Sequence, residues 1–224
     1  MYTIKIKNEI GVIILLLASI IGTAIIYPLL PQQLPIHWNL NGQIDGYASK
    51  NFFSAFLIPM IATIVYVLML FAPYFDPKKE KYVLFEKSYS LFRYAFVIFM
   101  ILMGTFVTMV ALGIKIPIGK VIPAGIGILF IIMGNMFGKI RQNWVFGIKF
   151  PWTLSSEQVW NRTHRFAGRF VVIIGVLLLI STLFNPQLTL AVLLAGIGFM
   201  VFGTAIYSYR LYRKEIAAKN QKAV

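Results

Sequence analysis

The sequence predicts an all-α integral membrane protein, a six-transmembrane-helix bundle with both termini cytoplasmic and an interfacial amphipathic helix after the fourth span. Its composition is the first reason: 59% of the 224 residues are hydrophobic and 12% are charged, whereas soluble domains are about half apolar and a quarter charged. The second is a set of six long apolar runs, and the third is the uneven placement of lysine and arginine between them.

The six apolar runs carry the predicted spans, because a bilayer core needs about 20 mostly apolar residues per helix. The runs are residues 11–30, 52–72, 94–114, 118–137, 170–184 and 188–207. The fifth run is short, so we expect it to include Phe166 and Ala167. The first run has an apolar centre like that of a signal peptide but lacks a small-residue cleavage site, which indicates a retained anchor.

The basic residues set the predicted orientation. The chain has 21 Lys and Arg against 7 Asp and Glu, and 18 of those 21 lie in the two tails and in the loops after the second and fourth spans. The positive-inside rule therefore places both termini in the cytoplasm. The net charge of +14 is then a topology signal, and we expect no direct nucleic acid binding. The lipid bilayer is the first expected partner.

The predicted spans offer little chemistry. Ion-coupled transporters place ionisable groups near the bilayer midplane, and the apolar centres of these runs lack them. With no cysteine, disulfides and thiolate chemistry are excluded, and His37 and His164 are predicted on opposite sides of the membrane. We expect no cofactor, no metal site and no enzymatic activity. Glycines instead favour close helix packing: span four has Gly125, Gly127, Gly134 and Gly138, the last two at small-xxx-small spacing, and span six has Gly196, Gly198 and Gly203.

The loop of residues 31–50 is the largest predicted on the outer side, and it carries turn signals at Asn41-Gly42 and Asp45-Gly46. Its aromatic residues predict either a recognition surface or an interfacial aromatic belt on a hairpin. The segment also resembles the PxHWNxxGxxDG signature of a small N-terminal module of unknown function that occurs in many bacterial membrane proteins. The residues predicted to face an outside partner are His37, Trp38, Asn39, Asp45 and Tyr47.

The segment of residues 138–169 is aromatic, polar and basic. Ser155 followed by Gln158 fits a capping box that would start a helix. From Val159 onward the apolar residues fall on one arc and the arginines on the next, which is typical of a helix lying in the interface. Glu157 and His164 share a third stripe; an acid/base pair is one interpretation, and a solvated face is the favoured one because no nucleophile or metal group accompanies them.

The same segment resembles the signature of the SdpI family. The residues that carry the resemblance, hereafter the signature residues, include Asn135, Arg141, Asn143, Gly147, Pro151, Trp152, Thr153, Trp160, His164, Arg165 and Gly168. Lys149 and Phe150 replace an arginine and a threonine usual in the family. The resemblance implies a six-span protein of the bacterial cytoplasmic membrane that gives immunity to a secreted peptide toxin and holds a transcriptional repressor at the membrane.

Together these patterns predict two modules: residues 1–90 with the outward loop, and an SdpI-like module of residues 91–224 with a basic C-terminal tail. The main hypothesis is a toxin-immunity and sensor protein without catalysis. The alternative is a small permease or lipid-handling protein, which predicts a pocket at membrane depth lined by Asn135 or threonines. If the signature segment is a folded element, Trp152 and Trp160 are predicted to be substantially buried.

Overall fold

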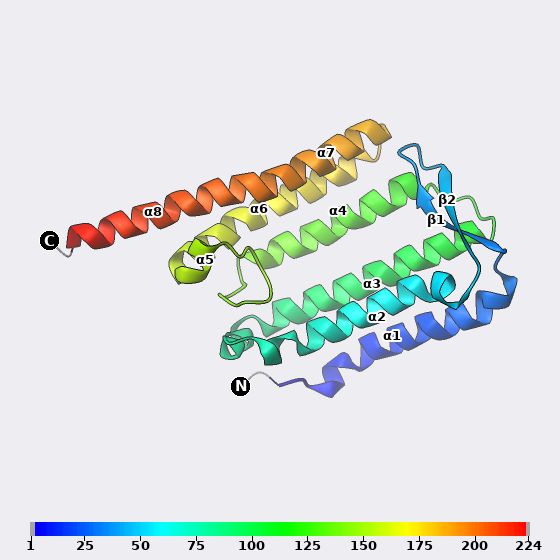
Figure 1. Cartoon of the computed structure of the whole chain (residues 1–224), viewed down its shortest axis with the longest axis horizontal. Helices are drawn as coiled ribbons and strands as arrows, with labels where there is room; N and C mark the ends of the chain where they lie inside the picture. The colour runs from blue at the N-terminus through cyan, green and yellow to red at the C-terminus, as the bar shows by residue number, and fades with distance from the viewer. Residues whose placement is uncertain (1–2, 223–224) are drawn as a thin grey trace.

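A computed structural model describes residues 3–222 and contains, within them, six helices long and apolar enough to cross a membrane (Figure 1). The first five spans are α1 (Ile6–Ile26, continued by the short helix η1, Tyr27–Leu29), α2 (Phe52–Phe75), α3 (Glu86–Ala111), α4 (Ile118–Phe137) and α6 (Glu157–Ser181). The sixth is formed by α7 (Pro186–Gly198), a π-helical turn η3 (Phe199–Gly203) and α8 (Thr204–Lys222). The prediction of a six-span membrane protein is confirmed.

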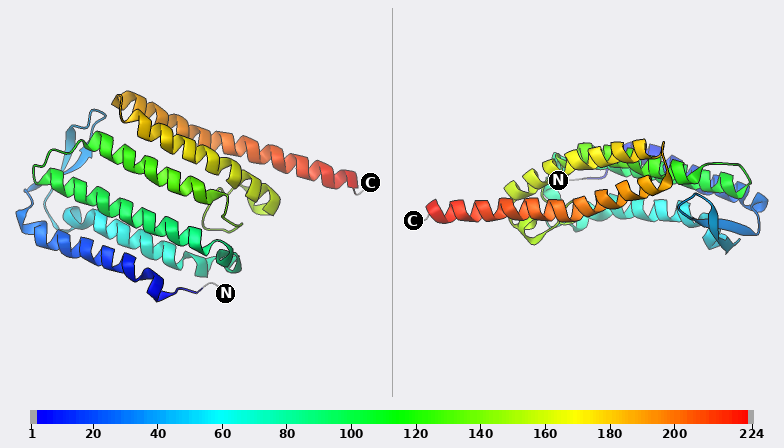
Figure 2. Two further views of the ribbon diagram at one scale, coloured as in Figure 1. Left: turned by 180° about the vertical axis from the view of Figure 1, so that it is seen from behind. Right: turned by 90° about the horizontal axis from the view of Figure 1, so that it is seen from above.

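The beginning of α1 and the end of α8 lie at one end of the molecule, and at the other end a small β-hairpin connects α1 to α2 (Figure 1). We call these the termini end and the hairpin end. The termini end also holds the short helices η2 (Lys79–Leu84) and α5 (Pro151–Ser155). Figure 2 shows that the helices form a flattened bundle and that α8 projects beyond its neighbours at the termini end. That the termini end faces the cytoplasm stays a prediction from the charge pattern.

The hairpin corrects the expectation of an all-α fold. Strands β1 (Gln33–Trp38) and β2 (Ile44–Ser49) pair antiparallel, with an irregular register around His37. The turn forms at the predicted Asn41-Gly42 signal, and Gly42 has a positive φ of 74°, a conformation that favours glycine. The Asn41-Gly42 turn brings the two halves of the loop side by side. Pairing as strands then satisfies their backbone N–H and C=O groups.

The closest helix packing joins α4 to α6 through two glycine pairs. A Cβ on Gly134 would lie 2.6 Å from the carbonyl oxygen of Gly168, and one on Gly127 would lie 2.8 Å from that of Gly175. Of the predicted small-xxx-small pair only Gly134 makes this close approach, because a Cβ on Gly138 would meet Arg165 at the ordinary contact distances of 3.4 and 3.9 Å. A seven-residue spacing on both helices carries the contact instead, which keeps the glycines on one face of each helix.

Helix α6 also differs from the expectation of a separate interfacial helix. Residues 157–181 form one continuous helix, so the amphipathic stretch is the beginning of the fifth span. Ser156 caps it by accepting a hydrogen bond from the Val159 N–H at 3.2 Å. The capping residue is therefore one position later than the predicted Ser155, which is the last residue of α5.

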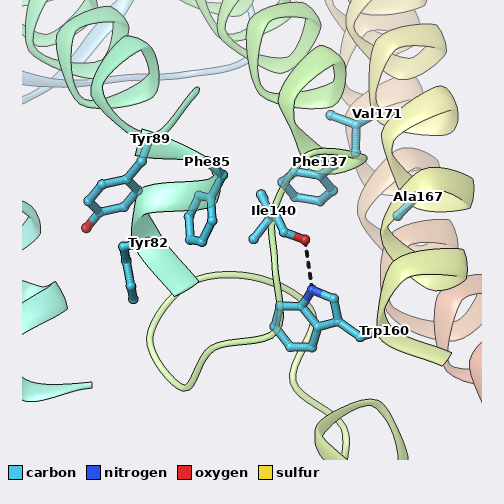
Figure 3. Packing of buried hydrophobic residues seen from close by; sticks show 8 residues of the cluster. All are labelled: Tyr82, Phe85, Tyr89, Phe137, Ile140, Trp160, Ala167 and Val171. Atoms are coloured by element: carbon cyan, nitrogen blue, oxygen red, sulfur yellow. Dashed lines mark hydrogen bonds between the residues drawn. The ribbon is translucent and has the colours of Figure 1, made fainter. Parts of the chain in front are cut away.

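Two buried clusters hold the termini-side half of the bundle together. One joins α1, α2 and α3, and the other joins η2, α3, α4 and α6 around an aromatic core (Figure 3). The first consists of Val12, Leu16, Ala62, Tyr66 and Val97. The second consists of Tyr82, Phe85, Tyr89, Phe137, Ile140, Trp160, Ala167 and Val171.

Candidate functional site

Residues 138–156, between α4 and α6, form a folded segment at the termini end that holds many of the signature residues and is hereafter called the cap. Asn143 organises its first turn. The Asn143 side chain is fully buried. Its Oδ1 accepts hydrogen bonds from the N–H groups of Val145 and Phe146, at 3.0 and 2.6 Å. Its Nδ2 donates to the carbonyl oxygens of Arg141 and Phe146, both at 2.8 Å. One amide thus satisfies four backbone groups, which gives the loop a defined conformation without regular secondary structure.

Asp76 joins this cap to the end of α2. It is almost completely buried, and its Oδ2 accepts hydrogen bonds from the Tyr82 hydroxyl and the Trp144 N–H, each at 2.9 Å. Its Oδ1 accepts from the Lys78 N–H at 2.7 Å. The sequence reasoning missed Asp76; the signal was an acidic residue between Phe75 and a proline at the end of an apolar run.

Gln142 and Thr153 join the cap to α5. The Gln142 Nε2 donates to the carbonyl oxygens of Thr153 and Leu154, at 2.9 and 2.8 Å, and its Oε1 accepts from the Lys78 ammonium. Thr153 is fully buried, and its hydroxyl accepts from the Phe150 N–H at 2.9 Å. These buried polar groups are thus hydrogen-bonded within the cap or to the residues beside it, as buried polar groups usually are.

Trp160 and His164 form the floor of the cap. The Trp160 Nε1–H donates to the Ile140 carbonyl oxygen at 3.0 Å (Figure 3), and its ring stacks on the His164 ring with centroids 4.1 Å apart. The His164 Nε2 accepts from the Ile148 N–H, and the Trp160 carbonyl lies 2.9 Å from Nδ1, which therefore carries the proton. Gly147 packs against the His164 ring. Only glycine suits this position, because its φ is 126° and an added Cβ would lie 2.5 Å from the His164 Nε2.

Trp160 is 0% exposed, so its predicted burial is confirmed, and the half-buried Trp152 meets the prediction in part. Trp152 stacks on Phe150 with centroids 5.1 Å apart and donates to the Ser208 hydroxyl of α8 at 2.8 Å. Its neighbour Pro151 begins α5. Lys149 donates to the carbonyl oxygens of two residues within the cap.

The remaining signature residues lie on α4 and α6. Asn135 is exposed and donates to a carbonyl of its own helix, the Ile131 carbonyl at 2.9 Å. Arg165 is exposed, whereas Gly168 is buried against α4. Asn135 does not line the cavity described below, which is the pocket that bears on the permease alternative.

Glu157 and His164 do not form a shared site. The Glu157 carboxylate pairs with the Lys81 ammonium of η2 at 3.0 Å and is half exposed, whereas both His164 nitrogens are engaged with backbone groups. Within residues 3–222 no group of three or more His, Cys, Asp or Glu side chains is placed to hold a metal ion.

The residues predicted to face an outside partner come together on the hairpin. His37 and Asp45 are exposed and bonded to each other at 2.5 Å, and Tyr47 is exposed. Asn39 serves the turn, because its Oδ1 accepts from the N–H groups of Asn41 and Gln43. Trp38 is half-buried and faces a cavity.

That cavity lies beneath the hairpin, between the hairpin-side halves of α1, α2 and α3, and has a volume of about 500 Å³. Its lining is uncharged and mostly apolar, with hydroxyl groups from Ser19, Thr23, Ser54, Thr105 and Thr108. The sequence predicted a compact bundle, and this cavity was not predicted. Lys50 anchors the hairpin above the cavity, since its ammonium donates to the Leu30 carbonyl at 2.9 Å.

A buried ion pair lies closer to the termini end in the same three helices. The Arg93 guanidinium of α3 donates to the Glu9 carboxylate of α1 at 2.6 Å, and the Tyr66 hydroxyl of α2 donates to the other carboxylate oxygen at 2.5 Å. This corrects the view that the bundle interior lacks ionisable groups. Both residues flank the apolar runs by one or two positions, and the helices begin earlier than those runs.

Profiles of two known sequence families match this chain, one in its N-terminal part and one in its C-terminal part. The sequence profile of the SdpI/YfhL protein family matches residues 139–208, which hold most of the cap. The profile of a domain of unknown function (DUF1648) matches residues 14–63, which include the hairpin. The chain is 28% identical over 208 residues to a protein named Immunity protein SdpI from Bacillus subtilis (strain 168), covering 93% of this chain and 97% of the relative. No solved structure matches it.

Proposed function

We propose that the chain is a membrane immunity protein that protects a bacterium from a secreted antimicrobial peptide, and that it acts by binding rather than by catalysis. The observation that carries the proposal is the end-to-end similarity to a protein named Immunity protein SdpI. Signature residues such as Asn143, Trp160 and His164 are fully buried, so the resemblance to the SdpI family includes residues that build this fold.

The proposed orientation places the hairpin outside and the cap in the cytoplasm of a bacterial cell, as the charge distribution predicts. A secreted peptide then meets the hairpin end. The cap is in direct contact with the helices that reach the hairpin end, through Asp76 at the end of α2 and through Tyr89 of α3, whose ring lies 5.9 Å from that of Phe146. These contacts connect the cap to the helices that a peptide would meet outside, and we propose that peptide binding there favours one of two arrangements of the cap.

Expression in a toxin-sensitive bacterial host tests immunity. Cells carrying the chain should survive doses of the peptide toxin that kill cells with an empty vector. The control is the Bacillus subtilis relative, expressed from the same vector. Survival equal to the empty vector, with the chain verified in the membrane and the relative protective, would reject immunity as the function.

The finer proposal is that the cap also holds a transcriptional repressor at the membrane. The cap exposes Trp144 and Val145, and the projecting part of α8 exposes Arg210, Arg213 and Lys214, so a surface with apolar and basic groups faces the cytoplasm in the proposed orientation. Toxin exposure should then raise transcription of toxin-responsive genes only in cells that carry the chain. A Trp144→Ala variant that still protects but no longer changes transcription would separate signalling from immunity.

The second candidate is a small permease or lipid-handling protein, and the cavity with its Thr23, Thr105 and Thr108 hydroxyl groups is the observation that favours it. Transport requires a path across the membrane. The buried cluster that includes Val12, Leu16 and Tyr66 closes the bundle between the cavity and the termini end, which favours binding over transport. Reconstituted vesicles that release or flip a fluorescent lipid only when they contain the chain would support the second candidate.

A further inference from the structure

We propose that the cavity beneath the hairpin binds an apolar segment of the antimicrobial peptide, a proposal that rests on the proposed function. The cavity has a volume of about 500 Å³, within the range of about 300 to 1,000 Å³ typical of ligand pockets. Its lining contains no Asp, Glu, Lys, Arg or His. A segment that enters it must therefore be uncharged, since an unpaired charge at this depth is costly.

Small side chains create the space. Ala18 and Gly22 of α1 and Ala55 of α2 line the cavity, and side chains this small leave unfilled volume between the helices. A Cβ added to Gly22 would meet no atom within 4 Å. Toward the termini end the cavity is closed by the cluster that includes Leu16 and Tyr66. A ligand therefore enters from the hairpin end or from the adjoining lipid, the side on which a secreted peptide arrives in the proposed orientation.

The hydroxyl groups favour a peptide over a lipid acyl chain. Thr23 donates to the Ser19 carbonyl and Thr105 to the Ile101 carbonyl, at 2.9 and 2.8 Å, which leaves the oxygen lone pairs of both hydroxyls as acceptors. A peptide N–H at membrane depth needs such an acceptor, and an acyl chain has no donor to offer. Trp38 adds an amphipathic ring between the cavity and the exposed face of the hairpin, where aromatic residues commonly contribute binding energy.

Filling the cavity is the first test. Gly22→Leu places a side chain in the open space, and Gly11→Leu is its matched control, because Gly11 lies on the same helix, does not line the cavity and also has no atom within 4 Å of an added Cβ. At equal membrane levels, we expect Gly22→Leu to lower the tolerated toxin dose about tenfold or more, the effect of losing ~1.4 kcal/mol of binding. Gly11→Leu should protect like the wild type. Equal protection by both variants would overturn the proposal.

Photo-crosslinking identifies the occupant. A benzophenone amino acid replaces Ile36, which lines the cavity and is 52% exposed, or Ile25, a lipid-facing control on α1 that is 69% exposed and does not line it. Membranes with the full chain are irradiated with the purified peptide toxin against which the Bacillus subtilis relative protects. We expect an adduct of the peptide's mass at position 36 only, reduced about tenfold by Gly22→Leu. Lipid-mass adducts alone at position 36 would assign the cavity to acyl chains and overturn the proposal.

The two experiments separate this proposal from the proposed function. Protection of the host without a peptide adduct at position 36 leaves immunity standing and rejects the cavity as the binding site. A peptide adduct that depends on Gly22, in cells that the chain does not protect, retains the cavity as a peptide site and rejects immunity.

Discussion

Arg93 Nη2 of α3 donates to Glu9 Oε1 of α1 at 2.6 Å, with the two residues 1% and 4% exposed. The Tyr66 hydroxyl completes the site from α2. Three helices therefore share one buried charge pair directly below the apolar cluster that closes the cavity. A buried pair gains Coulomb energy only if both charges are present and hydrogen-bonded, so each member depends on the others.

Removing the carboxylate alone should be costly. Glu9→Gln removes the carboxylate that pairs with the buried Arg93 guanidinium, which is expected to lower the free energy of unfolding by about 3–5 kcal/mol. The measurement is thermal unfolding of the detergent-solubilised full chain. Lys219→Ala, which removes the ion pair between the exposed Lys219 ammonium and Glu215, is the control and should cost less than about 1 kcal/mol. Equal stability of the two variants would contradict the interpretation of the pair as a buried structural charge.

The α4–α6 contact should not tolerate a methyl group. Gly168→Ala places a Cβ 2.6 Å from the Gly134 carbonyl oxygen, so the helix backbones must separate. We expect a loss of about 1–3 kcal/mol, the usual cost of overpacking, measured by the same unfolding assay. Gly198→Ala on α7 is the matched control, because its added Cβ meets no atom within 4 Å. A Gly168→Ala protein as stable as Gly198→Ala would mean that these helices pack differently.

Asp76→Asn should loosen the cap. The carboxylate accepts three hydrogen bonds, and an amide must turn donor hydrogens toward at least one of those donors. The expected cost is about 1–3 kcal/mol, the penalty for leaving buried polar groups unsatisfied. Limited proteolysis should show faster cleavage within residues 139–150. Asp45→Asn, in the exposed hairpin, serves as the control; unchanged cleavage in Asp76→Asn would show that the carboxylate is dispensable to the cap.

Trp160→Ala should lower the survival of toxin-treated cells more than Arg162→Ala does. Deleting a fully buried indole costs about 3–5 kcal/mol and removes the hydrogen bond to Ile140, whereas Arg162 is exposed and its loss should cost within about 0.5 kcal/mol. Survival is compared at matched protein levels. Retained protection in Trp160→Ala, together with loss in Arg162→Ala, would mean that the cap acts through surface charge.

The sequence alone predicted much of the frame. Apolar run length predicted the six spans because a membrane core has a fixed thickness, and Asn41-Gly42 predicted the hairpin turn because few residues accept its backbone angles. The burial of Trp160 followed from its place on the apolar arc of a helix. These features depend on local composition and spacing, which can be read from neighbouring residues.

Other features were decided by tertiary structure. Glu9 and Arg93 are far apart in the chain and meet only because α1 and α3 pack together, and composition alone placed both residues at the water-facing ends of their spans. Gly168 and Gly175 became packing residues because α6 pairs with α4, and the cavity depends on how the hairpin-side halves of α1, α2 and α3 meet beneath the hairpin. Periodicity shows which face of a helix is apolar or small. It does not show which helix covers that face, because that depends on the packing of the whole bundle.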